Sequence, residues 1–210
     1  MITAVIPALI CITLHEVSHG YVAYLQGDNT AKDKGRLSLN PIKHIDVMGL
    51  LMMIVFKVGW AKPVPVNMYN FKNPKKGMAV TALAGPVSNV LISILFLFIY
   101  GMLYKPFNSG SAAEQTVLQM VELTAYLSLG LAVFNIIPIP PLDGSKVLFS
   151  LLSDKSYYKL MRYERYGMLA LLALVATGVL GRPLNTAISY CYDKMFFIAQ
   201  FGYDLVSGGV

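Results

Sequence analysis

The chain has 210 residues, of which 56% are hydrophobic and 13% are charged, and its formal net charge at pH 7 is +6. A soluble domain of this length carries about a quarter charged residues, so the composition excludes a soluble protein and predicts an integral membrane protein. The positive charge does not indicate nucleic-acid binding, because the basic residues lie in loops between apolar segments, as is typical of loops that face anionic lipid.

The first apolar segment, residues 2–25, is long enough to cross about 30 Å of hydrocarbon. It contains His15, Glu16 and His19 in the pattern HEVSH. Two histidines four residues apart share one face of a helix and can bind one zinc ion, and the glutamate can accept a proton from the water that the metal activates. Ionisable side chains inside a membrane span usually mark a functional site. The segment therefore predicts zinc-dependent hydrolysis within the bilayer.

The next apolar stretch, residues 47–58, is too short for an ordinary helical span. If it does not cross the membrane, every lysine and arginine except Lys105, Arg182 and Lys194 falls on one side, which the positive-inside rule identifies as cytoplasmic. Residues 47–66 are therefore predicted to form a short re-entrant or interfacial hairpin of β-like character. Such a hairpin could offer a strand edge to an unwound substrate segment.

The remaining apolar segments complete the expected topology. Residues 77–104 and 117–142 are the predicted second and third spans, residues 166–181 are a short C-terminal span, and residues 184–206 are an interfacial or membrane helix. We expect two parts, a core over residues 1–152 and a C-terminal region over residues 153–210.

A third metal ligand is needed, because a catalytic zinc ion usually has three protein ligands and keeps its fourth position for water. The remaining candidates are His44, Asp46, Glu122 and Asp143. Glu122 lies near the outer end of its span, whereas the two histidines lie nearer the inner end of theirs. Asp143 follows three prolines that break the third helix near the inner face, which is the right depth. The residues alone leave open whether Asp143 is a ligand, with His44 as the next candidate, or a turn or helix-cap residue.

Three motifs in this order resemble the site-2 protease family of intramembrane zinc metalloproteases. They are HEVSH in the first span, Ala84-Gly85-Pro86-Val87-Ser88-Asn89 in the second, and Asn135 through Leu142-Asp143-Gly144 at the third. The loop residues 27–31, 39–46 and 59–67 resemble the compact prokaryotic branch, which lacks PDZ and CBS modules. The resemblance covers residues 1–150 and implies an all-α polytopic membrane protein with a three-helix catalytic core and additional C-terminal helices.

The resemblance also implies roles for particular residues. It implies that Asp143 joins His15 and His19 as the third zinc ligand, with Glu16 as the catalytic base. It further implies that Asn135 contacts the substrate or stabilises the oxyanion, and that Asn89 contacts the substrate. Asn135 could instead cap the helix ends that the prolines free, and Asn89 could form a hydrogen bond between helices.

The function implied is hydrolysis of peptide bonds in or near transmembrane segments of substrate proteins. We expect a multi-pass protein of a prokaryotic cell membrane whose active site faces the cytoplasm. Its expected partners are a transmembrane protein substrate, the lipid bilayer and a regulatory membrane protein, but no nucleic acid. Two alternatives remain: an inactive family member that acts as a membrane binding module, which predicts loss of Glu16 or a ligand, and a metal transporter, which predicts several ligand clusters.

Overall fold

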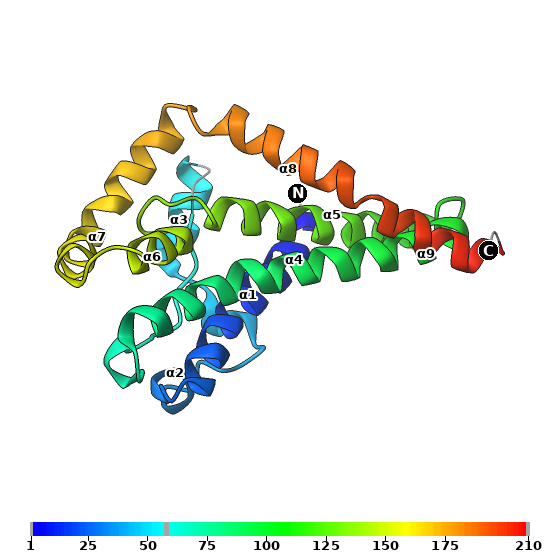
Figure 1. Ribbon diagram of the computed structural model, residues 1–210. Helices are drawn as coiled ribbons and strands as arrows, with labels where there is room; N and C mark the ends of the chain where they lie inside the picture. Colours follow the sequence, from blue (N-terminus) through cyan, green and yellow to red (C-terminus); the bar gives the residue numbers. More distant parts are fainter. Residues whose placement is uncertain (1, 57–58, 209–210) are drawn as a thin grey trace.

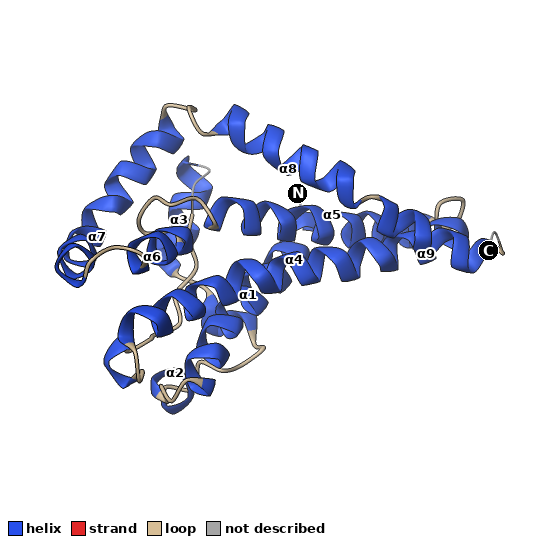
Figure 2. Cartoon of the chain, in the orientation of Figure 1, coloured by secondary structure: helices blue, strands red, loops and turns tan. Residues whose placement is uncertain are grey.

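The computed structural model describes residues 2–56 and 59–208, and every regular element in these ranges is helical (Figures 1 and 2). The long helices are α1 (Val5–Leu25), α4 (Pro74–Phe107), α5 (Ala112–Asn135) and α7 (Asp154–Ala176). The shorter α-helices are α2 (Thr30–Asp33), α3 (Val47–Phe56), α6 (Asp143–Ser150), α8 (Gly181–Met195) and α9 (Phe197–Ser207). Three 3₁₀ turns, η1 (Ile2–Ala4), η2 (Pro41–His44) and η3 (Met68–Asn70), complete the described elements.

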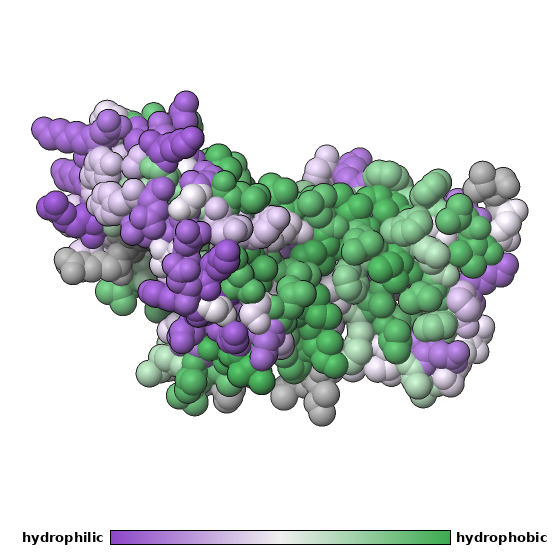
Figure 3. Space-filling model, turned by 90° about the horizontal axis from the view of Figure 1, so that it is seen from below, coloured by the Kyte–Doolittle hydropathy of each residue, from purple (hydrophilic) through white to green (hydrophobic). Residues whose placement is uncertain are grey.

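Helices α1, α4 and α5 form the centre of the molecule, and by length and composition each can cross a membrane. A fourth crossing is available if residues Tyr166–Ala176 and Gly181–Ser207 form one span that is bent by 85°. The face seen in Figure 3 has a broad apolar region, with many hydrophilic side chains at one end and fewer at the other. These features confirm the prediction of an all-α polytopic membrane protein.

The interface between the three central helices is built from small and weakly polar side chains. The hydroxyl of Ser128 on α5 donates to the backbone carbonyl of Asn89 on α4 at 2.8 Å, and the thiol of Cys11 on α1 lies 3.5 Å from the carbonyl of Thr124. All four residues are buried. Small side chains allow helix backbones to approach closely, which gives the van der Waals contact that holds helices together in lipid.

The predicted third span, residues 117–142, is helical only to Asn135, where α5 ends. A short irregular segment, residues 136–142, then leads into α6. This segment contains three prolines, which lack the N–H that would continue the helix. A Cβ atom on Gly144 would lie 2.0 Å from the carbonyl oxygen of Ile136, so the start of α6 packs directly against the end of α5.

The β-like hairpin predicted for residues 47–66 is wrong for residues 47–56, which form α3. The carboxylate of Asp46 accepts a hydrogen bond from the N–H of Gly49 at 2.8 Å and so starts this helix. Residues 57–58, part of the predicted hairpin, lie outside the described residues. Within the described ranges, β pairing is limited to one antiparallel bridge between Ile45 and Ala61.

Residues 59–67, which we call the strap, form an irregular segment beside α1 and α3. A Cβ atom on Gly49 of α3 would lie 2.1 Å from the carbonyl oxygen of Trp60, so α3 packs directly on the strap backbone. A Cβ on Gly20 of α1 would lie 2.8 Å from a methyl carbon of Val64. The strap is therefore held between these two helices.

Helix α9 packs along the second half of α4, with backbone in contact with backbone (Figure 1). A Cβ atom on Gly101 would lie 1.8 Å from the carbonyl oxygen of Ala199, and a Cβ on Gly202 would lie 2.4 Å from that of Phe98. A glycine on each helix thus permits the close approach. Leu97, also buried in this interface, has no exposed surface.

Asp28 connects the loop after α1 to the loop before α4. Its buried carboxylate accepts hydrogen bonds from the N–H and hydroxyl of Thr30, from the N–H of Asn67 at 2.7 Å and from the side-chain amide of Asn70 at 2.7 Å. Burial by itself would raise the pKa of Asp28, but these hydrogen bonds outweigh it and lower the pKa below its ordinary value of 3.8.

We expect Asp28→Asn to lower the free energy of unfolding by about 1–3 kcal/mol at pH 7, because the amide cannot accept all of these hydrogen bonds. The contribution of the charged carboxylate is fully present above the ordinary pKa of 3.8 and is lost as the pH falls through the lowered pKa of the folded protein. Thermal unfolding in detergent between pH 7 and pH 3 should therefore show the two proteins converging at low pH. The exposed Asp33→Asn serves as the control, and a difference that stayed constant with pH would contradict this role.

Candidate metal centre

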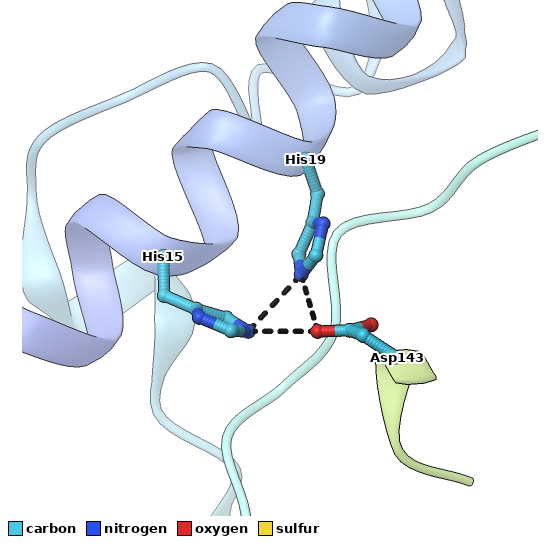
Figure 4. A group of neighbouring side chains, drawn as sticks. All are labelled: His15, His19 and Asp143. Atoms are coloured by element: carbon cyan, nitrogen blue, oxygen red, sulfur yellow. Dashed lines mark hydrogen bonds and ion pairs between the residues drawn. The ribbon is translucent and has the colours of Figure 1, made fainter. Parts of the chain in front are cut away.

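Three buried side chains from two separate helices point toward one another (Figure 4). His15 and His19 extend from the same face of α1, and Asp143 extends from the first turn of α6. The two imidazole Nε2 atoms are 3.0 Å apart, and each lies 3.2 Å from Oδ2 of Asp143. The exposed fractions of the three residues are only 7%, 8% and 8%.

The chemistry of this donor set fits a divalent metal ion. Ligand atoms about 2.0–2.1 Å from a tetrahedral zinc ion are about 3.3 Å from one another, which matches the edges of this triangle. Within the described residues, Oδ2 of Asp143 is buried and has no hydrogen bond of standard geometry. A divalent cation shared by the three side chains would offset the cost of burying the carboxylate charge.

The ring of His19 is oriented by the backbone of α4. Its Nδ1 lies 2.8 Å from the carbonyl oxygen of Thr81, and since a carbonyl can only accept, Nδ1 carries the hydrogen. This tautomer leaves the lone pair of Nε2 free to face Asp143 and a metal ion. His15 Nδ1 has no such partner among the described residues.

Gly85 of α4 provides the space that the two imidazoles occupy. A Cβ atom at this position would lie 2.5 Å from Cε1 of His15 and 2.5 Å from Nε2 of His19. Thr81 and Gly85 are four residues apart and so share one face of α4. This face supplies both the carbonyl that orients His19 and the space for the pair of rings.

Asp143 reaches the histidines because the chain changes direction after α5. The irregular segment of residues 136–142 ends α5 and allows α6 to begin beside the metal centre. The carboxylate lies in the first turn of α6, where the helix dipole favours a negative charge. Lys146, one turn later, places its ammonium 3.9 Å from Oδ1 of Asp143.

Glu16 follows His15 on α1 but is held by a different contact. Its Oε2 accepts a hydrogen bond from the backbone N–H of Val64 in the strap at 2.8 Å, and its side chain is partly exposed. The carboxylate predicted to act as a base is thus fixed by the strap and is not one of the three converging groups.

The two asparagines lie in different environments. Asn135 is partly exposed at the end of α5, where its side-chain amide donates to the carbonyl of Leu131 at 2.9 Å. Asn89 is fully buried, and its side-chain amide has no partner among the described residues. The hydrogen bond between helices at Asn89 uses its backbone carbonyl and not its side chain. Substrate contact by either residue stays a prediction.

The other candidate ligands lie apart from this centre. His44 is buried, with Nε2 2.8 Å from the carbonyl of Ser38, and Asp46 caps α3. Glu122 lines a cavity of about 460 Å³ with Tyr126 and Tyr192. In the described part of the chain, the group of His15, His19 and Asp143 is the one cluster of three ligands close enough to share an ion.

Sequence reasoning missed three supporting groups: the carbonyl of Thr81, the space at Gly85 and the N–H of Val64. Gly85 belongs to a recognised motif, but the motif does not indicate which side chains face it. A backbone group has no residue-type signature, so only the spacing of Thr81 from Gly85 could have indicated its position.

We expect Gly85→Ala to weaken metal binding roughly 10- to 100-fold, because the added methyl group displaces both imidazoles. Gly130→Ala is a matched control, since a Cβ at that position would meet only a side-chain carbon of Ile188 at 3.6 Å, an ordinary contact. Mass spectrometry of bound metal after dialysis against graded chelator measures the effect. Equal metal retention by the two variants would contradict the role assigned to Gly85.

Comparison with known proteins identifies relatives of this chain. Residues 101–178 match the family described as "Peptidase family M50". The chain is 39% identical over 174 residues to "Putative zinc metalloprotease YwhC" of Bacillus subtilis, which covers 82% of this chain and 80% of that protein. It is 26% identical over 205 residues to "Putative zinc metalloprotease Rip2" of Mycolicibacterium smegmatis, covering 96% of this chain and 76% of that protein.

No solved structure matches the chain. The similarity to YwhC extends over most of both proteins, and the histidine and aspartate group supplies ligands that zinc commonly takes. Together with the apolar helices, these findings place the chain among membrane proteins of the site-2 protease type. The chain therefore belongs to peptidase family M50, a family of zinc metalloproteases.

Proposed function

We propose that this protein is an active endopeptidase that cleaves transmembrane proteins in or near their membrane-spanning segments. The observation that carries the proposal is the convergence of His15, His19 and Asp143, with Glu16 on the adjacent position of α1. Three ligands leave one position of a tetrahedral metal ion for water, which is the arrangement of catalytic and not of structural zinc sites. The retention of Glu16 favours an enzyme over an inactive binding module.

In this proposal, His15, His19 and Asp143 would hold one zinc ion, whose positive charge would polarise the scissile carbonyl and lower the pKa of water toward neutrality. Glu16 accepts a proton from the attacking water as the water oxygen bonds to the carbonyl carbon. It then gives this proton to the leaving amine as the C–N bond breaks. The Thr81 carbonyl keeps His19 in the tautomer that leaves Nε2 free.

Asn135 is proposed to stabilise the negative charge that develops on the carbonyl oxygen. Its side-chain nitrogen has two hydrogens, and one of them bonds to the Leu131 carbonyl. The second hydrogen is left to donate to the oxyanion. A substrate contact by Asn89 would need the burial of this residue to be relieved when the substrate binds, since it has no exposed surface.

We further propose that the site faces the cytoplasm of a prokaryotic cell. The basic residues of the loop before α4 and of the segment around α6 and α7 support this orientation through the positive-inside rule. The substrate is a transmembrane protein that must unwind locally, because a helical backbone keeps its carbonyls hydrogen-bonded. A regulatory membrane protein is proposed as a second partner.

Cleavage of a reconstituted transmembrane substrate, measured with bound metal, tests this function. We expect Glu16→Gln to keep its metal and lose activity about 10²- to 10⁴-fold, because it removes the proton acceptor. Asp143→Asn should lose both metal and activity, and the exposed Asp193→Asn should lose neither. Equal cleavage by wild type and Glu16→Gln would refute the mechanism, and full metal content in Asp143→Asn would refute the ligand assignment.

A further inference from the structure

The strap passes α1 close to the metal-binding histidines. Val64, near its middle, is only 7% exposed and packs against Gly20, the residue that follows His19. Its backbone N–H donates to Oε2 of Glu16 at 2.8 Å, across 48 residues of sequence. A hydrogen bond to an ionised carboxylate is shorter and stronger than one between neutral groups.

The sequence around Val64 leaves this donor without a local competitor. Pro63 and Pro65 have no N–H, so Val64 supplies the one backbone donor among the three residues. A residue that precedes proline is restricted to extended conformations, which applies here to both Lys62 and Val64. The Pro-Val-Pro sequence therefore presents a single N–H on a stiff backbone.

Hydrogen bonds fix the strap on both sides of Val64. The N–H of Lys62 donates to the carbonyl of His44 at 2.9 Å, and the carbonyl of Lys62 accepts from the guanidinium of Arg36 at 2.7 Å. On the other side, the N–H of Asn67 donates to the buried carboxylate of Asp28. The donor at Val64 is thus held in place by contacts that do not involve Glu16.

We infer that the backbone N–H of Val64 positions Glu16 for catalysis. It binds Oε2, whereas Oε1 has no hydrogen bond among the described residues and is left to receive the proton from water. Val64 is a positioning residue, and this inference rests on the proposed role of Glu16 as the base.

The opposite effect would follow if the strap were a latch that kept Glu16 away from the reacting water. Removing the N–H of a latch would raise kcat, whereas removing the N–H of a positioning residue lowers it. The sign of the change in kcat therefore separates the two, and an increase would overturn the inference.

Exchange of the Val64 amide for an ester, by incorporation of the corresponding α-hydroxy acid, removes the N–H and keeps the side chain. We expect kcat for a reconstituted transmembrane substrate to fall roughly 10- to 100-fold, with KM changed less than about two-fold and metal content unchanged. The same exchange at Met68, whose N–H donates no hydrogen bond in the described structure, should leave kcat unchanged. Val64→Pro, a second variant without this N–H, should reproduce the fall in kcat.

A measurement without substrate tests the contact itself. The Val64 ester should lower the thermal unfolding temperature of wild type, and this decrease should disappear in a Glu16→Ala background, because the acceptor is then absent. An equal decrease in both backgrounds would overturn the inference.

The kinetic results separate this inference from the proposed function. If wild type cleaved the substrate and Glu16→Gln did not, a Val64 ester with wild-type kcat would refute the positioning role of Val64 and leave the proposed function intact. If wild type did not cleave, the proposed function would fail while the thermal cycle still tested the contact.

Discussion

The arrangement of the central helices depends on the close approach of two imidazoles and one carboxylate in a buried setting. Each of these groups would lose favourable hydration inside apolar helices, and the carboxylate oxygen lies 3.2 Å from the Nε2 atom of each imidazole. A divalent cation bound between the three groups would attract all of them and so replace the hydration that they lose. Three features make this cluster possible. Gly85 leaves space for the two rings, the carbonyl of Thr81 orients His19, and the third span ends early enough for α6 to begin beside the histidines.

The two kinds of ligand reach the centre by different physical routes. The histidines come from a continuous helix, where a spacing of four residues alone places them on one face. The aspartate comes from the first turn of α6, a short helix that begins beside the histidines after α5 has ended at Asn135. The irregular segment of residues 136–142 lets the chain change direction between α5 and α6. The close packing of Gly144 on the backbone of Ile136 then fixes the position of α6.

The sequence predicted the helical class and the central spans, because composition and the length of apolar segments carry that information. The residues alone left the third ligand open, and the resemblance to the site-2 protease family singled out Asp143, which the structure places beside His15 and His19. The sequence did not predict the conformation of residues 47–56. Their apolar run lacks a period that separates strand from helix, and the one local signal for a helix is the cap that Asp46 forms at its start. It also could not predict the contact between Glu16 and Val64, since this depends on a backbone group brought close by the tertiary fold.

The packing of Gly144 against the carbonyl of Ile136 also has a mechanical consequence. The backbone at the end of α5 and the backbone at the start of α6 are in direct contact, because Gly144 has no side chain that would separate them. A sideways displacement of the end of α5 by an incoming polypeptide would be transmitted directly to the aspartate. A change in the position of this helix end would therefore alter the distance between Asp143 and the two histidines.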